Sequence, residues 1–418
     1  MNLNRRTILV VSFASLFHFS ASADDWPQFL GPNRNGISSE KGLIETWPKD
    51  GLKELWRVKG GVGMSAMVVA DGQAITLVQT ESRQRVIALD AKTGRTRWVS
   101  DIAPAYGNGQ GDGPRATPVI HEKNVFAYTG DGILACVDVA SGAVSWQRDT
   151  LKALKLKEPD YGIASSPIVI GDNVIVMTGG NPGSLAAFSA TSGRLVWSEG
   201  GRDTAGYSSP VLLNLSGADQ LVAFTGSSVL AVNPQNGKRL WRYEFVTDYD
   251  CNIATPVAFG KQQLLISSGE NHGSVMLKVT GSDDSFEVEE VWTSLGRNSV
   301  LRSAWQTGIV DGPYLYGFDN VGAAGPVMHY TCIDLRDGSR QWAKQRFGKG
   351  NHISADGKLF ISTMKGELVV VAKDPKEYRE LGRMEVVGTT RQAPTIADGR
   401  LYLRDSEDIV CLDVKRQP

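Results

Sequence analysis

The sequence has 418 residues and a formal net charge of −1. Because basic and acidic residues balance, the chain lacks the positive excess that is typical of proteins that bind nucleic acid or acidic membrane surfaces. Length alone predicts two or three domains of roughly 150 residues each, but a pattern that repeats along the chain favours one closed repeat domain.

The N-terminus predicts an export signal at 1–23. A basic start at Asn4–Arg6 precedes an apolar run at 8–19, and Ala21–Ala23 fits a cleavage site, so we expect the mature chain to begin at Asp24. The apolar run is shorter than the ~20 residues that span a bilayer, and no later stretch is long enough. We therefore expect a soluble periplasmic protein, exported by the ordinary route or by the twin-arginine route that its paired arginines also fit.

Residues 24–51 are predicted to form an N-terminal arm. This stretch is rich in glycine, asparagine and proline and has no strand pattern, yet Trp26, Phe29 and Trp47 indicate that it is ordered, since large aromatic side chains are seldom left in water. The next stretch, Leu52–Val58, has the pattern of a single strand with nothing before it to complete a sheet.

The segment Val86–Trp98, VIALDAKTGRTRW, recurs four more times along the chain. In every copy a glycine lies four residues before the tryptophan, and a polar residue lies eight before it. The apolar first half suits a strand, the polar residue and glycine suit a tight turn, and the second half suits the returning strand. Each copy is thus a β-hairpin whose tryptophan, with about 150–250 Å² to bury, must pack against the next repeat.

Tryptophans at intervals of roughly 40–50 residues mark the repeats. Two further short strands precede each hairpin, which gives four antiparallel strands per repeat. The repeat at 351–381 has Leu381 near the tryptophan position, and in the repeat before it the first strand is expected at 302–309. The predicted docking tryptophans are Trp56, Trp98, Trp146, Trp197, Trp241, Trp292 and Trp342.

The two ends of the repeat region complement each other. Residues 392–414 supply three strands, and Leu52–Val58 supplies the fourth strand that this last repeat lacks. The sequence therefore predicts an all-β, eight-bladed β-propeller over 52–418, closed by its N-terminal strand. An open β-solenoid is the alternative, but it would not explain why the partial repeats match.

Three cysteines, Cys136, Cys332 and Cys411, occupy the same position in separate repeats, where alanine stands in other copies. A position that alternates between alanine and cysteine is typical of a small buried residue. Export would permit disulfides, but equivalent positions of different repeats do not meet, so we expect none among these three. Cys251 lies in a loop and has no obvious partner.

The repeated pattern A-apolar-D-x-x-[ST]-G-x-x-x-W resembles the tryptophan-docking motif of quinoprotein propellers. That family includes the alcohol dehydrogenases that depend on pyrroloquinoline quinone (PQQ) and the outer-membrane assembly factor BamB. The opening DWPQFLGPNRNGIS is also similar to exported PQQ-repeat proteins of planctomycete type, most of which have no assigned activity. The resemblance covers essentially the whole mature chain and implies an eight-bladed fold, but it says little about function, because the motif joins blades to one another.

Ligands of propellers bind at the central channel, near the loops that lead into the innermost strands. The arginines of these loops could hold a carboxylate or phosphate with two parallel hydrogen bonds, or they could pair with loop aspartates and line a wet channel. The predicted ligand-binding residues of these loops are Asp112, Arg115, Tyr207, Asp250, Asn252, Arg302, His352 and Arg391.

For an enzyme, the resemblance implies PQQ with Ca²⁺, an aspartate base and, in many members, a disulfide between adjacent cysteines. Asp248, Asp250 and Asn252 could supply oxygen ligands to a hard cation, although turn residues show the same alternation. The chain has no adjacent cysteines and no C-x-x-C-H haem motif, and no metal site is predicted. We therefore expect a monomeric, non-catalytic scaffold that binds an envelope protein or a small anionic ligand. A PQQ-dependent oxidoreductase acting on an alcohol or sugar is the alternative.

Overall fold

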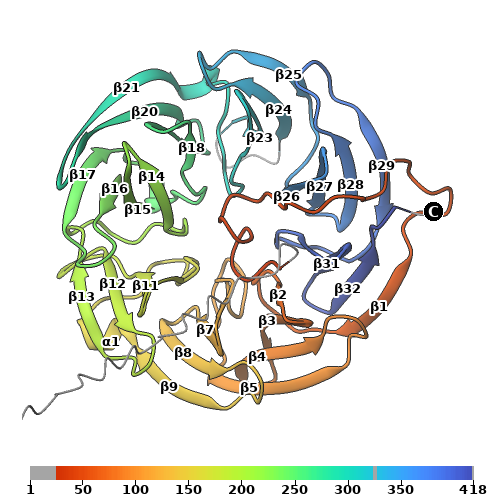
Figure 1. Ribbon diagram of the computed structural model, residues 1–418, viewed down its shortest axis with the longest axis horizontal. Helices are drawn as coiled ribbons and strands as arrows, with labels where there is room; N and C mark the ends of the chain where they lie inside the picture. The colour runs from red at the N-terminus through yellow and green to blue at the C-terminus, as the bar shows by residue number, and fades with distance from the viewer. Residues whose placement is uncertain (1–24, 323–326, 417–418) are drawn as a thin grey trace, which may run out of the picture.

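The computed structural model describes residues 25–322 and 327–416, so the predicted export signal lies outside the described residues. Its strands form eight four-stranded antiparallel sheets arranged as blades around a central channel (Figure 1). The helical segments of the described residues are short: α1 (Thr150–Leu154) and the 3-10 turns η1 (Asp248–Asp250) and η2 (Gly296–Asn298). None of them has the length and apolar character needed to cross a bilayer. The predicted eight-bladed β-propeller is confirmed.

In every blade the first strand lies nearest the channel and the fourth lies at the rim (Figure 1). Blade 1 contains β2 (Val68–Ala70), β3 (Gln73–Thr80), β4 (Arg83–Asp90) and β5 (Thr96–Pro104). Blade 2 contains β6 (Val119–His121), β7 (Asn124–Tyr128), β8 (Ile133–Asp138) and β9 (Val144–Asp149). Blade 3 contains β10 (Ile168–Ile170), β11 (Asn173–Met177), β12 (Leu185–Ser189) and β13 (Leu195–Glu199). Blade 4 contains β14 (Val211–Leu215), β15 (Ala218–Phe224), β16 (Ser228–Val232) and β17 (Arg239–Glu244).

The second half of the ring follows the same order. Blade 5 contains β18 (Val257–Phe259), β19 (Gln263–Ser268), β20 (Gly273–Ser282) and β21 (Ser285–Leu295). Blade 6 contains β22 (Ile309–Asp311), β23 (Tyr314–Asn320), β24 (Met328–Asp334) and β25 (Arg340–Lys344). Blade 7 contains β26 (Gly350–Ala355), β27 (Lys358–Thr363), β28 (Glu367–Ala372) and β29 (Glu380–Glu385). Blade 8 contains β30 (Thr395–Ala397), β31 (Arg400–Arg404), β32 (Asp408–Asp413) and, from the N-terminal side, β1 (Glu54–Lys59).

The ring closes through β1, which pairs antiparallel with β32 and sets Trp56 opposite Cys411. Strands from the two ends of the propeller therefore share one sheet, as the complementary partial repeats predict. Closure removes the free sheet edges that an open array would expose.

Most of the docking tryptophans bond to the next blade, whereas the Trp241 indole donates to the Gln220 side chain of its own blade. In blade 1, the Trp98 indole donates a 2.9 Å hydrogen bond to the carbonyl oxygen of Val139 in blade 2. Gly142, in the same turn as Val139, has a φ of +77°, and a side-chain carbon there would come within 2.8 Å of the Trp98 ring. Glycine is thus required both by the turn and by the tryptophan above it. The same contact pairs Trp56 with Gly94, Trp146 with Gly193, Trp197 with Gly237 and Trp292 with Gly338.

The predicted small-residue position lies opposite the tryptophan of its own hairpin. Cys136 pairs with Trp146, and Ala88 pairs in the same way with Trp98. All four cysteines of the chain are free, and Cys136, Cys332 and Cys411 lie in different blades. The position therefore serves packing beside the indole, as the alternation of alanine and cysteine indicates.

Blade 7 differs from the sequence prediction by one residue. A β-bulge in β29 leaves Leu381 unpaired and sets Gly382 opposite Val370, at the place of the tryptophan in other blades. Leu381 thus lies near the tryptophan position, as predicted, and is displaced from it by one residue because the bulge puts two residues opposite one. Trp47 of the arm fills the vacant position, since a side-chain carbon on Gly382 would overlap its ring at 1.8 Å.

The first strand of blade 6 also lies elsewhere than predicted. Strand β22 begins at Ile309, and the residues before it form a loop at the channel instead of a strand over 302–309. The backbone N–H of Arg302 donates to the side-chain carboxylate of Asp319 in β23 at 3.1 Å, and its carbonyl oxygen accepts from the backbone N–H of Asn320 at 2.9 Å. The segment is therefore held to β23 by one side-chain and one backbone hydrogen bond instead of a regular ladder.

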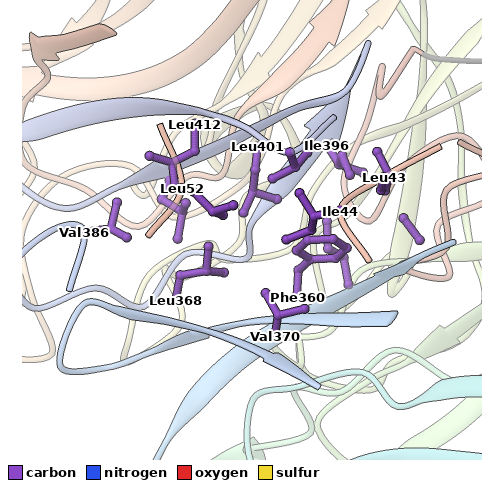
Figure 2. Packing of buried hydrophobic residues seen from close by; sticks show 14 of the residues in the cluster. Leu43, Ile44, Leu52, Phe360, Leu368, Val370, Val386, Ile396, Leu401 and Leu412 are labelled. Carbon is purple, nitrogen blue, oxygen red and sulfur yellow. The ribbon is translucent and has the colours of Figure 1, made fainter. Parts of the chain in front are cut away.

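The N-terminal arm is ordered, as its tryptophans predict, and crosses the middle of the ring (red in Figure 1). Trp26 exchanges backbone hydrogen bonds with Val69 of β2, and the Arg34 guanidinium donates to the carbonyl oxygens of Ser166 and Pro167. Farther along, the arm packs between blades 7 and 8. The labelled side chains of this packing in Figure 2 include Leu43, Ile44, Leu52, Phe360, Val370, Leu401 and Leu412.

Replacing Trp47 with alanine is expected to lower the free energy of unfolding by about 2–3 kcal/mol, somewhat below the loss for a fully buried tryptophan. The loss follows because the arm supplies the indole that blade 7 lacks over Gly382. Urea denaturation of the mature protein measures it, and Trp47→Phe, which keeps a ring there, should lose less. Equal stability of Trp47→Ala and the parent protein would contradict this role of the arm.

Candidate functional site

The wall of the central channel is held together by hydroxyl groups. Serine or threonine recurs just before the inner strands, and in blades 2 to 5 a proline follows it. The hydroxyl oxygen accepts a hydrogen bond of 2.9–3.1 Å from the backbone N–H of the equivalent residue in the preceding blade. These bonds run from Ala66 to Thr117, from Thr117 to Ser166, from Ser166 to Ser209 and from Thr255 to Thr307. They fix the inner strands relative to one another and so give the channel a rigid mouth.

A cavity of about 560 Å³, which we call the funnel, occupies this mouth. The loops that lead into the inner strands form its sides, and Phe29 and Leu30 of the arm contribute to its lining. The arm pairs farther along the inner strands, where Trp26 meets Val69 and Pro27 accepts from the N–H of Ile120. The arm therefore closes the funnel at one end and leaves the loop side open. Its volume is in the range of small-molecule sites.

One side of the funnel carries Arg115, Lys349 and Arg391, which we call the cationic wall. The Lys349 ammonium lies 4.8 Å from the centroid of the Trp305 ring, and the Arg391 guanidinium lies 5.4 Å from it. Arg115 lies 4.9 Å from the Tyr106 ring. In the part of the chain that the structure describes, these three side chains form no ion pair with a carboxylate; the arginines donate to backbone carbonyls instead.

Burial has an electrostatic effect on this wall. It lowers the pKa of Arg115 and the pKa of Lys349, because the charged forms lose contact with water. The nearby charge of Arg391 lowers both pKa values further. Carboxylates act in the opposite direction. The charges of Glu158 and Asp112 raise the pKa of Arg115, and that of Glu270 raises the pKa of Lys349. Three like charges are thus gathered on one wall without a direct ion pair to any residue that the structure describes.

The facing side carries Asp248 and Glu270, which we call the acidic wall, together with His272. The backbone N–H of Asp248 donates to Nε2 of His272 at 3.3 Å. The Tyr161 and Tyr207 rings contact each other at a tilt, with centroids 5.6 Å apart. Burial raises the pKa of the Tyr207 hydroxyl, which accepts a hydrogen bond from the backbone N–H of Tyr161 at 3.4 Å.

Four of the eight predicted ligand-binding residues line the funnel: Arg115, Tyr207, His352 and Arg391. His352 does so as a structural residue. Its Nδ1 lies 2.8 Å from the Tyr330 hydroxyl, and its Nε2 donates to the carbonyl oxygen of Thr307 at 2.8 Å. Burial lowers the pKa of His352 to about 4, so the ring is neutral at pH 7.

The other four predicted residues, Asp112, Asp250, Asn252 and Arg302, lie outside the funnel lining. The Asn252 amide is fully buried and donates to the carbonyl oxygens of Thr225 and Phe245, which fixes a loop. Arg302 is 3% exposed and forms a two-pronged ion pair with Asp319, at 2.7 and 2.8 Å. Its guanidinium therefore stabilises the blade and is not free to bind a ligand.

Sequence reasoning missed Trp305, Lys349 and Glu270. Lys349 belongs to a loop that was assigned to the channel, and a lysine beside the predicted arginines was a usable signal. Trp305 was assigned both to the channel loop 298–305 and to the strand expected over 302–309, and it was not chosen as a ligand-binding residue; the strand begins only at Ile309. Glu270 lies in the turn between β19 and β20, outside the loops that join blades, and has a left-handed φ of +53°.

The family resemblance implies PQQ with Ca²⁺. The described residues of the funnel fit the carboxylates of PQQ but do not form a calcium site. The cationic wall suits the carboxylates of PQQ. The candidate calcium ligands do not converge, because the side-chain oxygen of Asn252 accepts from the Thr247 hydroxyl at 3.2 Å and Asp250 packs on Gly226. No cluster of three or more histidine, cysteine, aspartate or glutamate side chains is placed to share a metal ion among the described residues.

Comparison with known proteins places this geometry in context. The chain matches the family model described as outer membrane protein assembly factor BamB over residues 37–157, 82–344 and 328–414. It is 24% identical over 259 residues to BamB of Shewanella oneidensis, which covers 60% of each chain. It is 29% identical over 123 residues to quinohemoprotein alcohol dehydrogenase ADH IIB of Pseudomonas putida, which covers 28% of this chain and 17% of the enzyme. The chain spans 58–61% of the length of the BamB relatives that it matches.

Solved structures show the same fold at low sequence identity. The quinohemoprotein alcohol dehydrogenase of Comamonas testosteroni superposes with a TM-score of 0.65 at 14% identity, covering 94% of this chain and 81% of the enzyme. BamB of Moraxella catarrhalis superposes with a TM-score of 0.59 at 15% identity, covering 87% of this chain and 99% of that protein. An assembly factor and an enzyme thus share the architecture, so function has to be argued from the site.

Proposed function

The chain belongs to the PQQ-repeat propeller family described as outer membrane protein assembly factor BamB, and we propose that it acts as an exported, non-catalytic scaffold of the cell envelope. The export signal predicted at 1–23 and the names of its BamB relatives support this location. The proposal requires a surface for a protein partner, and one loop cluster beside the funnel meets that requirement.

The observation that carries the proposal is a set of three exposed apolar residues on the loop between blades 4 and 5 and at the end of β21, which we call the rim patch: Val246, Tyr249 and Leu295. Tyr249 also lines the funnel. These three residues are 62%, 71% and 54% exposed, the highest values among the large hydrophobic residues that the structure describes. They flank His272, because Asp248 beside Tyr249 bonds to its ring and Leu295 pairs with the adjacent Gly273. Exposed apolar clusters of this kind mark protein contact sites.

The backbone of Tyr249 adds to this argument. Its φ of +59° is in the left-handed region, which is costly for an aromatic residue, and Asp250 follows at +56°. Strain of this kind is retained mainly at functional sites. The loop presents the tyrosine ring to solvent, and tyrosine is enriched at protein interfaces. We infer that Tyr249 is the anchor of the contact.

A photo-crosslinking amino acid at position 249 is expected to trap a discrete envelope protein in living cells, because a bound partner would cover the rim patch. Denaturing electrophoresis and mass spectrometry of the product identify it. The same amino acid at Val99, which is 49% exposed on β5 across the ring, is the matched control. Adding Val246→Asp should abolish the product without unfolding the protein. Equal products at 249 and 99, or none at 249, would contradict the scaffold proposal.

The cationic wall beside Trp305 favours a second candidate, a PQQ-dependent oxidoreductase acting on an alcohol or sugar. PQQ would supply hydride-accepting quinone chemistry when bound, and this wall would hold its carboxylates. Calorimetry with PQQ, with and without Ca²⁺, tests binding, and dye reduction with alcohols and sugars tests activity. Tight binding together with substrate-dependent reduction would overturn the scaffold proposal.

A further inference from the structure

The charges of the funnel are separated across the ring. Arg115, Lys349 and Arg391 belong to the loops that lead into blades 2, 7 and 8, while Asp248 and Glu270 belong to the loops of blade 5. In Figure 1 the inner strands on the blade 8 and blade 1 side lie across the channel from those of blades 4 and 5. Arg115 and Arg391 therefore lie across the channel from the acidic wall. Lys349, in the loop of blade 7, lies nearer to Glu270 and interacts with its charge.

The charges of the two walls are not neutralised by close partners. The cationic wall forms no ion pair within the described residues, and neither does Glu270, while the Asp248 carboxylate lies 3.6 Å from Nε2 of His272. Glu270 is close enough to Lys349 to raise the pKa of that ammonium. A ligand that spans the funnel would meet three positive charges at one end and a carboxylate at the other.

The middle of the funnel is aromatic and apolar. Tyr161, Tyr207 and Trp305 line it between the charged walls, and Phe29 and Leu30 of the arm lie in the same lining. A volume of about 560 Å³ is far more than one inorganic anion fills and is in the range of pockets that hold ligands of 20 or more heavy atoms, at roughly 300–1,000 Å³. The ligand therefore needs an organic body between its charged ends.

We propose that the funnel binds a zwitterionic ligand of short-peptide size, with its carboxylate against Arg115, Lys349 and Arg391 and its ammonium toward Glu270. A plain polycarboxylate fits less well, because its negative charge would also approach Glu270, and like charges brought together in a cavity disfavour binding. This site goes beyond the scaffold function and does not depend on it, since the funnel does not need a partner to form; Tyr249 belongs both to the rim patch and to the funnel lining.

Calorimetry of the mature protein with a tripeptide that has a central phenylalanine tests the ligand class. The peptide with free termini is expected to bind, and amidating its carboxylate or acetylating its ammonium should each weaken binding about 10-fold or more. Citrate tests whether an anion that has no ammonium group binds the funnel equally well. Absence of binding by every peptide form, or citrate binding as tightly as the free peptide, would overturn the proposal.

Variants connect the binding to the two walls. Lys349→Met and Arg391→Met should each weaken the free peptide about 10-fold or more, whereas Glu270→Gln should weaken the free peptide and leave the acetylated one unchanged. Lys344→Met is the matched control, because Lys344 also lies over an aromatic ring, 5.3 Å from the Tyr378 centroid, but outside the funnel. Arg115 is left intact, since it holds the carbonyls of its own loop. Equal losses in Lys344→Met and Lys349→Met would overturn the assignment.

Discussion

Replacing Trp146 with alanine is expected to lower the free energy of unfolding by about 3–5 kcal/mol. The ring is 8% exposed, packs on Gly193 of the next blade and lies 6.0 Å from the Phe126 ring, and its indole N–H donates to the carbonyl oxygen of Ala190 at 2.9 Å. Alanine would remove the contact that joins blades 2 and 3 and would leave that carbonyl without its partner. Urea denaturation followed by fluorescence and circular dichroism measures the loss.

Two further variants separate docking from a general effect on β9. Val144→Ala changes an exposed side chain of the same strand, 39% exposed, and should cost less than about 1 kcal/mol. Gly193→Ala would force a methyl group to within 2.5 Å of the Trp146 ring at a φ of +63°, so it should also destabilise strongly. In Trp146→Ala the ring is gone, and the added cost of Gly193→Ala should shrink. Additive losses, or a loss below about 1 kcal/mol for Trp146→Ala, would show that the tryptophan does not dock blade 3.

The fold could be predicted from the sequence because its signals are local and repeated. A glycine and a tryptophan four residues apart define one hairpin, and the copies leave no strand unmatched when β1 joins β32. The prediction failed where a contact bridges distant parts of the chain. The sequence placed Leu381 near the missing tryptophan of blade 7, but no local pattern reveals that the ring over Gly382 comes from Trp47.

The candidate site was predicted only in part, for a related reason. Position in a loop before an inner strand correctly selected Arg115 and Arg391, which line the funnel. The same rule selected Arg302, but a loop position does not reveal whether a carboxylate on a neighbouring strand lies close enough to pair with the arginine. Asp319, at the end of β23, takes up that guanidinium. Whether an arginine serves the fold or a ligand is decided by the charges that tertiary structure brings beside it.

Replacing Asp319 with alanine is expected to lower the free energy of unfolding by about 3–5 kcal/mol, because it leaves the Arg302 guanidinium buried without its counter-charge. The Asp319 carboxylate is inaccessible to solvent, binds Arg302 through both oxygens and accepts a further 2.9 Å contact from Arg340. It also accepts from the backbone N–H of Arg302, so its loss frees the loop before β22. Chemical denaturation at pH 7 measures the loss.

The double variant Arg302→Met with Asp319→Leu distinguishes a structural pair from a ligand site. Replacing both members of a buried pair with apolar residues of similar size is often neutral. Much of the stability lost in Asp319→Ala should therefore return in the double variant. The part that came from the ion pair between Arg340 and Asp319 should stay lost. The zwitterionic peptide should bind this double variant as it binds the parent, since Arg302 lies outside the funnel lining. If Asp319→Ala kept full stability, or if the double variant bound the peptide 10-fold more weakly, Arg302 would belong to the ligand site after all. The cationic wall would then have to include blade 6.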